Sequence, residues 1–292
     1  MPIHVKRAAK YGFCSGVRVA DIKVRRFARA GGSGAILGQV VHNERVVSEM
    51  ESLGMRTVHA IDEVAEPTIV FSAHGVPPSF HEAATRQGLA ILDTTCKFVY
   101  DIHHESLDAL ADGCHLVFIG DPNHREVIGY THDLDPDRYH IVLTMDEARA
   151  VDWSRYPKVK IFYQTTLNAD HFEEVVRHIE AANSQTTRAD TICYATKENQ
   201  DAARELAQNP EVDLVIVIGG RKSANTYHLW EITSRWKRSH LIQGPEDIEP
   251  TWLEGVGCVG LTAGASTPDT LIDEVEPFLA AEGGEEGLRA QG

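Results

Sequence analysis

Short β-branched runs alternate with longer amphipathic stretches along almost the whole chain. AILGQVV is followed by NERVVSEMESLG, TIVFSAH by SFHEAATRQG, and LAILDTT by KFVYDIHHESLDALADG. The pattern continues through HLVFIG, KVKIFYQ, VDLVIVIG and GCVGLTAG, and it closes with the stretch PDTLIDEVEPFLAAE. Strands that alternate with helices are typical of βα units and of parallel sheets. The pattern therefore predicts an α/β fold whose strands are mostly parallel.

Three of the five cysteines divide the chain into parts of similar length. Cys14, Cys96 and Cys193 are almost evenly spaced, and each gap is long enough for one small α/β unit. The closing residues are rich in Gly and Glu without apolar periodicity, which is typical of a flexible tail. We therefore expect three pseudo-equivalent α/β units followed by a tail, at residues 1–96, 97–193, 194–282 and 283–292.

The composition argues against several classes of function. Of the 292 residues 42% are hydrophobic, enough for a sizeable core. A formal net charge of -15, with no block of Lys and Arg, argues against nucleic acid as a partner, because that needs a concentrated basic surface. The amino-terminal MPIHVKRAAKYGFC lacks the apolar core of a signal peptide, and the apolar runs are too short to cross a bilayer. We expect a cytoplasmic protein with no membrane partner.

Polar side chains follow the predicted strands at unusually many positions. Open parallel sheets bind ligands beyond the carboxyl ends of their strands, so a site is expected there. A single His or Ser after a strand is more often a turn or capping residue than a ligand, so only the set as a whole indicates a site. The set consists of His42, His74, Cys96, His124, Glu126, Thr165, Ser223, Asn225 and Ser266. If the three units face one centre, thiolates, imidazoles, a carboxylate and hydroxyls meet in one cavity.

The same three cysteines are candidates for holding a metal. Cys14 lies in GFCSG, where flanking glycines let the backbone approach a bulky partner. Three thiolates suit either zinc or an iron-sulfur centre, and thiolate ligation alone does not separate the two. Cys114, and Cys258 inside GCVGLTA, are interpreted as small hydrophobic residues. No two cysteines form a CxxC motif, so a metal site would be assembled from distant segments.

A series of short motifs favours the iron-sulfur centre. In chain order they are GFCSGV, VVHNERVV, FSAHGVPP, LDTTC, NHREVIG, YQTTL, ICYAT, KSANT and TAGASTPD. In this order and spacing, from about Gly12 to Asp269, the chain resembles the 4-hydroxy-3-methylbut-2-enyl diphosphate reductase family, also called IspH or LytB. The resemblance implies an iron-sulfur reductase that removes the hydroxyl group of (E)-4-hydroxy-3-methylbut-2-enyl diphosphate with two electrons and two protons. The products would be isopentenyl diphosphate and dimethylallyl diphosphate, at the last step of the methylerythritol phosphate pathway of isoprenoid synthesis.

The resemblance also implies a role for each candidate residue. Cys14, Cys96 and Cys193 would hold one [4Fe-4S] cluster per chain at the centre of the three units, with one iron lacking a protein ligand. Glu126 would donate a proton so that the hydroxyl leaves as water, and Thr165 would relay that proton. The diphosphate substrate would be bound by His42, His74, His124, Thr165, Ser223, Asn225 and Ser266. Reduced ferredoxin or flavodoxin would supply the electrons.

Four positions depart from the commoner pattern of that family. Lys97 stands where a Pro usually follows the second cysteine, and Arg125 also replaces a frequent Pro. Ala224 replaces a frequent Ser, and Asn199 a frequent Arg. Ala224 removes one candidate phosphate donor, whereas Lys97 and Arg125 add positive charge near the predicted site.

Three other classes of protein are alternatives to the reductase. A cluster-dependent hydro-lyase would also use three cysteines and an open iron, but it would consume no reducing equivalents. An iron-sulfur sensor would hold the cluster without catalysis, which the histidines and Glu126 together disfavour. A nicotinamide dehydrogenase is disfavoured because no GxGxxG motif follows a strand; GGSGAILG follows a predicted helix and has the wrong spacing.

Overall fold

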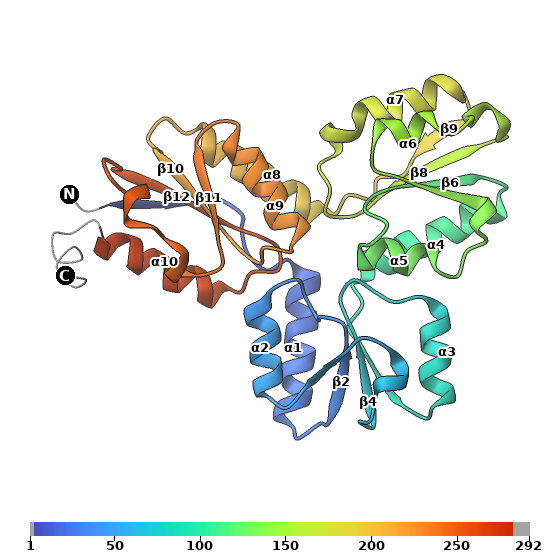
Figure 1. Ribbon diagram of the computed structural model, residues 1–292, viewed down its shortest axis with the longest axis horizontal. Coiled ribbons are helices and arrows are strands. Elements are labelled where there is room, and N and C mark those ends of the chain that lie inside the picture. The colour runs from blue at the N-terminus through green and yellow to red at the C-terminus, as the bar shows by residue number, and fades with distance from the viewer. Residues whose placement is uncertain (1–2, 283–292) are drawn as a thin grey trace. The chain divides into compact units, whose positions relative to one another are not determined.

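The computed structural model of the chain describes residues 3–282. The strands of this part of the chain form three sheets of four strands each, and every paired strand is parallel to its neighbours. Helices connect the strands and cover the sheets (Figure 1). The predicted α/β fold with three pseudo-equivalent parallel sheets is confirmed. Short 3-10 helices lie in the loops at Ile61–Glu63, Pro136–Arg138, Trp153–Arg155, Ala169–Phe172, Pro245–Asp247 and Pro250–Trp252.

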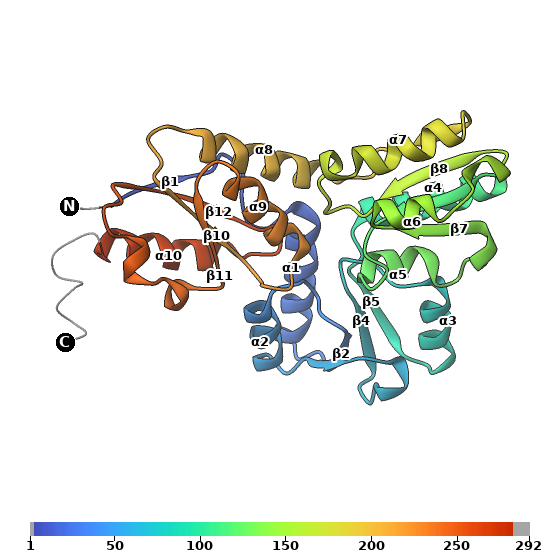
Figure 2. The same cartoon turned by 45° about the horizontal axis from the view of Figure 1, so that its top comes forward.

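The first sheet has the strand order β3-β2-β4-β5. Its strands are β2 (Gly34–Leu37), β3 (Arg56–Val58), β4 (Thr68–Phe71) and β5 (Ala90–Asp93). Its helices are α1 (Ser15–Arg29), α2 (Glu44–Ser52) and α3 (Pro78–Arg86). Leu37 and Phe71 of the sheet pack with Ala84 of α3, and α1 and α2 lie on the other side of the sheet (Figure 2). Helices on both faces explain why the central strands are apolar throughout.

The second sheet has the order β7-β6-β8-β9. Its strands are β6 (His115–Ile119), β7 (Tyr139–Val142), β8 (Val159–Tyr163) and β9 (Thr186–Arg188). Its helices are α4 (Lys97–Ala111), α5 (Arg125–Thr131), α6 (Met145–Arg149) and α7 (Glu173–Ala182). Phe118 packs with Ile102 of α4 and Tyr130 of α5, whereas Ile119 packs with Val176 of α7 on the opposite face.

The third sheet has the order β1-β12-β10-β11. Its strands are β1 (His4–Arg7), β10 (Leu214–Ile218), β11 (Arg238–Ile242) and β12 (Cys258–Ala263). Its helices are α8 (Tyr194–Gln208), α9 (Ala224–Ser234) and α10 (Asp269–Glu282). Ile216 packs against the α10 side of the sheet, whereas Val215 and Val217 pack with α8 and α9 (Figure 1). Since both faces of β10 are covered, its sequence is apolar at every position.

The three sheets repeat one arrangement of strands. β2, β6 and β10 hold the same inner position, and β5, β9 and β1 hold the same edge. In the third sheet this edge strand comes from the start of the chain, where β1 pairs with β12. By their contacts, residues 3–17, 42–46 and 194–282 form one compact unit, and residues 18–41 and 47–193 form another. The predicted boundaries after residues 96 and 193 stay a prediction, and the predicted tail, 283–292, lies outside the described residues.

Two histidines on the neighbouring strands β6 and β7 of the second sheet contact each other. His115 Nε2 lies 2.6 Å from His140 Nδ1, and the His115 ring stacks on Tyr156 with 3.7 Å between ring centroids. Only 4% of His115 is exposed. Burial, together with the neighbouring His140, lowers the pKa of His115 to about 4. A positive charge on His115 would be poorly solvated and would lie near the cationic Arg138 and Arg155, so the fold favours the neutral form.

We expect acid to destabilise the protein through His115. The unfolded chain protonates this residue near its ordinary pKa of 6.5, whereas the folded protein resists protonation down to about 4. Stability is therefore lost as the pH falls from about 6.5 towards 4, by on the order of 1 to 3 kcal/mol from this residue. Urea unfolding at pH 7 and pH 5 should show a smaller loss for His115→Gln than for the wild type. Exposed His59→Gln is the control, and equal losses in all three proteins would contradict the expectation.

Candidate active site

The loops after the inner strands carry the candidate residues at equivalent positions. The first residue after β2, β6 and β10 is a glycine in each case. The fifth residue after each of these strands is His42, His124 or Ser223, and a helix begins one or two residues later. His124 and Ser223 are the N-caps of α5 and α9, and Asn43 accepts the first backbone N–H groups of α2. Polar side chains that cap a helix after a parallel strand are held at the ligand-binding edge of the sheet.

The three predicted cluster cysteines also occupy equivalent positions. Cys14, Cys96 and Cys193 each stand immediately before a helix, namely α1, α4 and α8. Each cysteine N–H donates to the carbonyl oxygen two residues beyond a strand. These bonds are Cys14 to Ala265 (3.1 Å), Cys96 to Ala73 (3.0 Å) and Cys193 to Thr165 (3.1 Å). All three cysteines are partly exposed. A helix N-terminus favours a thiolate over a thiol, so this donor set fits a soft metal centre.

Glu126 is a buried carboxyl group with several hydrogen-bond donors around it. Only 2% of the residue is exposed. Its Oε1 accepts the backbone N–H of Thr165 at 2.6 Å and the hydroxyl of Tyr130 at 3.1 Å, and its Oε2 accepts the Thr165 hydroxyl at 2.8 Å. Burial raises the pKa of Glu126 to about 7 although these bonds act in the opposite direction. Near neutral pH the group can therefore both hold and release a proton.

Two imidazoles lie beside this carboxyl group. His124 Nδ1 accepts the backbone N–H of Glu126 at 3.3 Å, so in the neutral ring Nε2 carries the hydrogen. The rings of His124 and His74 are perpendicular, with 5.9 Å between their centroids. His74 follows Ala73, the acceptor for Cys96, and Thr165 is the acceptor for Cys193. The larger compact unit thus brings together six predicted residues: His74, Cys96, His124, Glu126, Thr165 and Cys193.

The other compact unit brings the remaining predicted residues together. Ser266 Oγ donates to the His42 carbonyl oxygen at 3.1 Å and lies 3.3 Å from Ser223 Oγ. Ser266 follows Ala265, the acceptor for the Cys14 N–H. Asn225 is 3% exposed, yet neither polar atom of its amide has a hydrogen-bond partner among the described residues. A buried amide without partners costs stability, which is expected where a ligand completes the bonds.

A close backbone approach positions His42 in this second set. A Cβ atom on Gly220 would lie 2.6 Å from the His42 carbonyl oxygen and 2.9 Å from the Glu44 carboxylate. The Gln243 amide also donates to Glu44 at 2.9 Å. Only a glycine at 220 therefore lets the segment 42–46 pack here. The sequence interpretation missed Gly220, and the pair of glycines after VDLVIVI was the available signal.

Tyr130 is the second residue that the sequence interpretation missed. It lies one helical turn after Glu126 on α5 and is bonded to it. Burial and the neighbouring Glu126 raise the pKa of Tyr130 well above 10, and the thiols of Cys96 and Cys193 act in the same direction. The i to i+4 spacing on a predicted helix was the available signal.

The four departures from the family pattern have different surroundings. The Lys97 side chain is 86% exposed and pairs with Asp101 at 2.6 Å. The Arg125 guanidinium lies over Gly38, where a Cβ atom would come within 3.2 Å of Cζ. Ala224 is the first residue of α9. Asn199 is buried in α8, and its amide nitrogen has no partner among residues 3–282.

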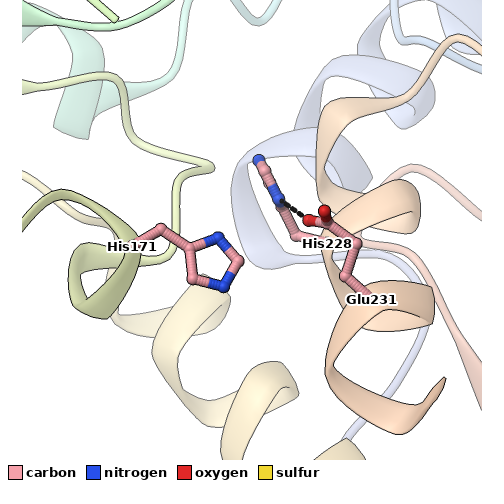
Figure 3. A group of neighbouring side chains, drawn as sticks. All are labelled: His171, His228 and Glu231. Atoms are coloured by element: carbon pink, nitrogen blue, oxygen red, sulfur yellow. Dashed lines mark hydrogen bonds and ion pairs between the residues drawn. The ribbon is translucent and has the colours of Figure 1, made fainter. Parts of the chain in front are cut away.

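Other polar and sulfur-containing groups have local partners. On α9, His228 Nδ1 lies 2.9 Å from Glu231 Oε2, one helical turn away (Figure 3); His171, also drawn there, belongs to the other compact unit. Cys114 and Cys258 are partly exposed rather than fully buried, and both pack against hydrophobic clusters. None of the helices within residues 3–282 has the length and apolar character needed to cross a membrane.

We expect Gly220→Ala to displace His42, which the sequence predicts to bind the substrate. The added methyl group would meet a backbone oxygen at 2.6 Å, so the segment 42–46 must shift. The expected result is a KM at least about tenfold higher and a stability loss of about 1 to 3 kcal/mol. Steady-state kinetics and urea unfolding measure both quantities. Gly257→Ala is the matched control, because its Cβ atom would lie 3.5 Å from the Asp213 carboxylate, at ordinary contact distance. An unchanged KM in Gly220→Ala would refute this positioning of His42.

Known proteins that are similar to this chain belong to the family that the order of its motifs indicates. The family model described as LytB protein matches residues 5–280. The 4-hydroxy-3-methylbut-2-enyl diphosphate reductase of Leifsonia xyli subsp. xyli is 39% identical, over 94% of this chain and 83% of its own length. The protein of the same name from Cutibacterium acnes is 36% identical, over 94% of this chain and 86% of its own length.

Solved structures agree as well. The E-1-hydroxy-2-methyl-but-2-enyl-4-diphosphate reductase from Plasmodium falciparum superposes with a TM-score of 0.87 at 26% identity, covering 96% of this chain and 88% of its own. A second structure, of (E)-4-hydroxy-3-methyl-but-2-enyl diphosphate reductase, the terminal enzyme of the non-mevalonate pathway, has a TM-score of 0.71 at 32% identity. It covers 96% of this chain and 99% of its own. The resemblance noted from the motifs is confirmed, and the chain belongs to the LytB family.

Proposed function

We propose that this protein is a 4-hydroxy-3-methylbut-2-enyl diphosphate reductase of the methylerythritol phosphate pathway. It removes the hydroxyl group of (E)-4-hydroxy-3-methylbut-2-enyl diphosphate reductively, giving isopentenyl diphosphate and dimethylallyl diphosphate. The observation that carries the proposal is the buried Glu126 carboxyl group bonded to Thr165, in a chain whose relatives share the reductase name. The family match favours this reaction over that of a cluster-dependent hydro-lyase.

The three cysteines would hold the iron-sulfur cofactor. Cys14, Cys96 and Cys193 precede helices at equivalent positions and are all partly exposed, which supports a shared role. Three protein ligands leave one iron of a [4Fe-4S] cluster without a protein ligand. When bound, such a cluster supplies electrons and an electron-poor iron beside the substrate hydroxyl. No GxGxxG motif follows a strand, so we assign electron supply to a separate cytoplasmic protein, reduced ferredoxin or flavodoxin.

The diphosphate would be bound by the imidazole, hydroxyl and amide groups predicted for it. His42, Ser223, Asn225 and Ser266 lie in one unit, and His74, His124 and Thr165 in the other. The backbone N–H groups at the start of α9 add donors and a positive dipole end. A net charge of -15 does not prevent this, because imidazoles and helix ends determine the local potential in a pocket.

Glu126 and Thr165 would bring a proton to the leaving hydroxyl group. A hydroxide ion leaves poorly, whereas protonation lets it leave as water. The Thr165 hydroxyl bonds Glu126 Oε2 at 2.8 Å, so a proton on Oε2 can pass to Thr165 as the Thr165 proton passes onward. Since Glu126 has a pKa of about 7, its acid form is well populated at neutral pH.

We expect Glu126→Gln to abolish most of the reductase activity. In the absence of oxygen, the wild type should oxidise a reduced viologen dye when the substrate is added. The variant should lower kcat by about 10² to 10⁴, because an amide cannot donate the proton. The wild-type kcat should fall as the pH rises through about 7, since Glu126 then loses its proton. The residual kcat of the variant should not show this decrease with pH.

The matched control for this assay is exposed Glu174→Gln, which should retain wild-type activity. Iron content and the visible absorption spectrum must match in all three proteins. If the wild type carries a full cluster and yet oxidises no dye with substrate, the reductase assignment is wrong. The hydro-lyase and the sensor would then become the leading hypotheses.

We expect Asn225→Leu to separate stability from binding. The buried amide has no hydrogen-bond partner among residues 3–282, so an apolar side chain of similar size should leave stability equal or raise it by about 1 kcal/mol. The same change should raise the Kd for inorganic diphosphate and the KM for the substrate about tenfold or more. Thermal unfolding and titration calorimetry measure the two effects. Lower stability with unchanged diphosphate binding would show that the amide has a structural role instead.

A further inference from the structure

The two oxygens of Glu126 have different neighbours. Oε2 accepts the hydroxyl of Thr165 at 2.8 Å, whereas Oε1 accepts the hydroxyl of Tyr130 at 3.1 Å and the backbone N–H of Thr165 at 2.6 Å. A carboxyl group can take up a proton on one oxygen and release one from the other. Glu126 is 2% exposed, so water does not reach it freely to restore a proton that it has given away. Each turnover would therefore need a second path that leads to this carboxylate.

A cavity of about 430 Å³ is lined in part by Tyr130, and also by His74. It lies in the larger compact unit, where α3, α4 and α5 contribute to its walls. Its lining includes His81, His103, His104, Leu107, Gly129 and Tyr130. His104 and Leu107 are exposed, whereas Tyr130 is buried. The lining is mostly apolar, but the cavity is open to solvent, and imidazole groups can both accept and donate protons.

We propose that Tyr130 returns a proton from this cavity to Glu126 after each turnover. The Tyr130 O–H bond breaks as an O–H bond forms on Glu126 Oε1, and a proton from a cavity water or imidazole forms a new O–H bond on Tyr130. One proton moves to the carboxylate in total, and no electron moves; a half-turn of the carboxyl group about its Cγ–Cδ bond then brings the protonated oxygen beside the Thr165 hydroxyl. The inference rests on the proposed function, because it is the use of Glu126 as a proton donor that creates the need to reload it.

The position of the Tyr130 hydroxyl is well defined. Its ring stacks on Phe118, with 5.9 Å between the ring centroids and 19° between their planes. Tyr130 and Glu126 are one turn apart on α5, so the helix backbone fixes their separation. Thr165 engages the other carboxylate oxygen, which leaves the two hydroxyls free to act in sequence rather than in competition.

The test compares the first turnover with the later ones in Tyr130→Phe. The variant keeps the ring and removes only the hydroxyl. Anaerobic holoenzyme at pH 6, with Glu126 protonated in advance, is mixed with substrate and a saturating excess of reduced viologen, and product is measured by rapid quench. The first turnover should match the wild type, and later turnovers should be about tenfold slower or more and slower again in D₂O. The product trace should therefore show a burst of one equivalent per cluster.

Tyr139→Phe is the matched control, because Tyr139 packs edge-on against the same Phe118 and should leave both phases unchanged. Cluster absorption and thermal unfolding must agree among the three proteins. Equal rates in Tyr130→Phe and the wild type would overturn the inference. A first turnover slowed as much as the later ones would also overturn it, because Tyr130 would then only orient Glu126. A wild type that forms no product would instead refute the proposed function itself.

Discussion

One backbone hydrogen bond recurs in all three sheets, and the candidate site depends on it. In each case the N–H of a cysteine at the start of a helix donates to the carbonyl oxygen two residues beyond a strand. The bond ties the helix that follows an edge strand to the loop after the neighbouring strand. Because the strands are parallel, the loops that carry His74, Thr165 and Ser266 lie at the same edges as the cysteines. Each sheet therefore presents one cysteine and one polar loop at the same edge.

Two polar groups of the candidate site are buried in surroundings that reduce the stability of the fold. Glu126 is buried with a raised pKa, and the Asn225 amide has no partner among the described residues. Either feature lowers the stability of the ligand-free protein. Under the proposed function both would be useful, since Glu126 would deliver a proton and the Asn225 amide would gain a partner in the diphosphate. Chemical function thus accounts for two features that packing alone leaves unexplained.

The repeated architecture also explains which parts of the fold could be predicted. The apolar runs such as Leu214–Ile218 are buried on both faces, so their composition indicated parallel strands before any contact was known. The order of the motifs follows the order of the strands, because the motifs lie in loops at the carboxyl ends of these strands. The motif order therefore indicated the family. The pairing of β1 with β12 was not evident, since an edge strand from the start of the chain looks the same in sequence whichever sheet it joins.

The sequence by itself determined the fold class, the family and the identity of the candidate acid, ligands and thiols. These follow from residue type and order along the chain, which local propensity and motif spacing express directly. Only the tertiary structure decided that Glu126 is buried deeply enough for its pKa to rise to about 7, that Gly220 lies against the His42 carbonyl, and that Tyr130 joins Glu126 to a cavity. Desolvation, close backbone contact and the path of a proton depend on atoms that are distant in sequence, so they exist only once the sheets and helices have packed.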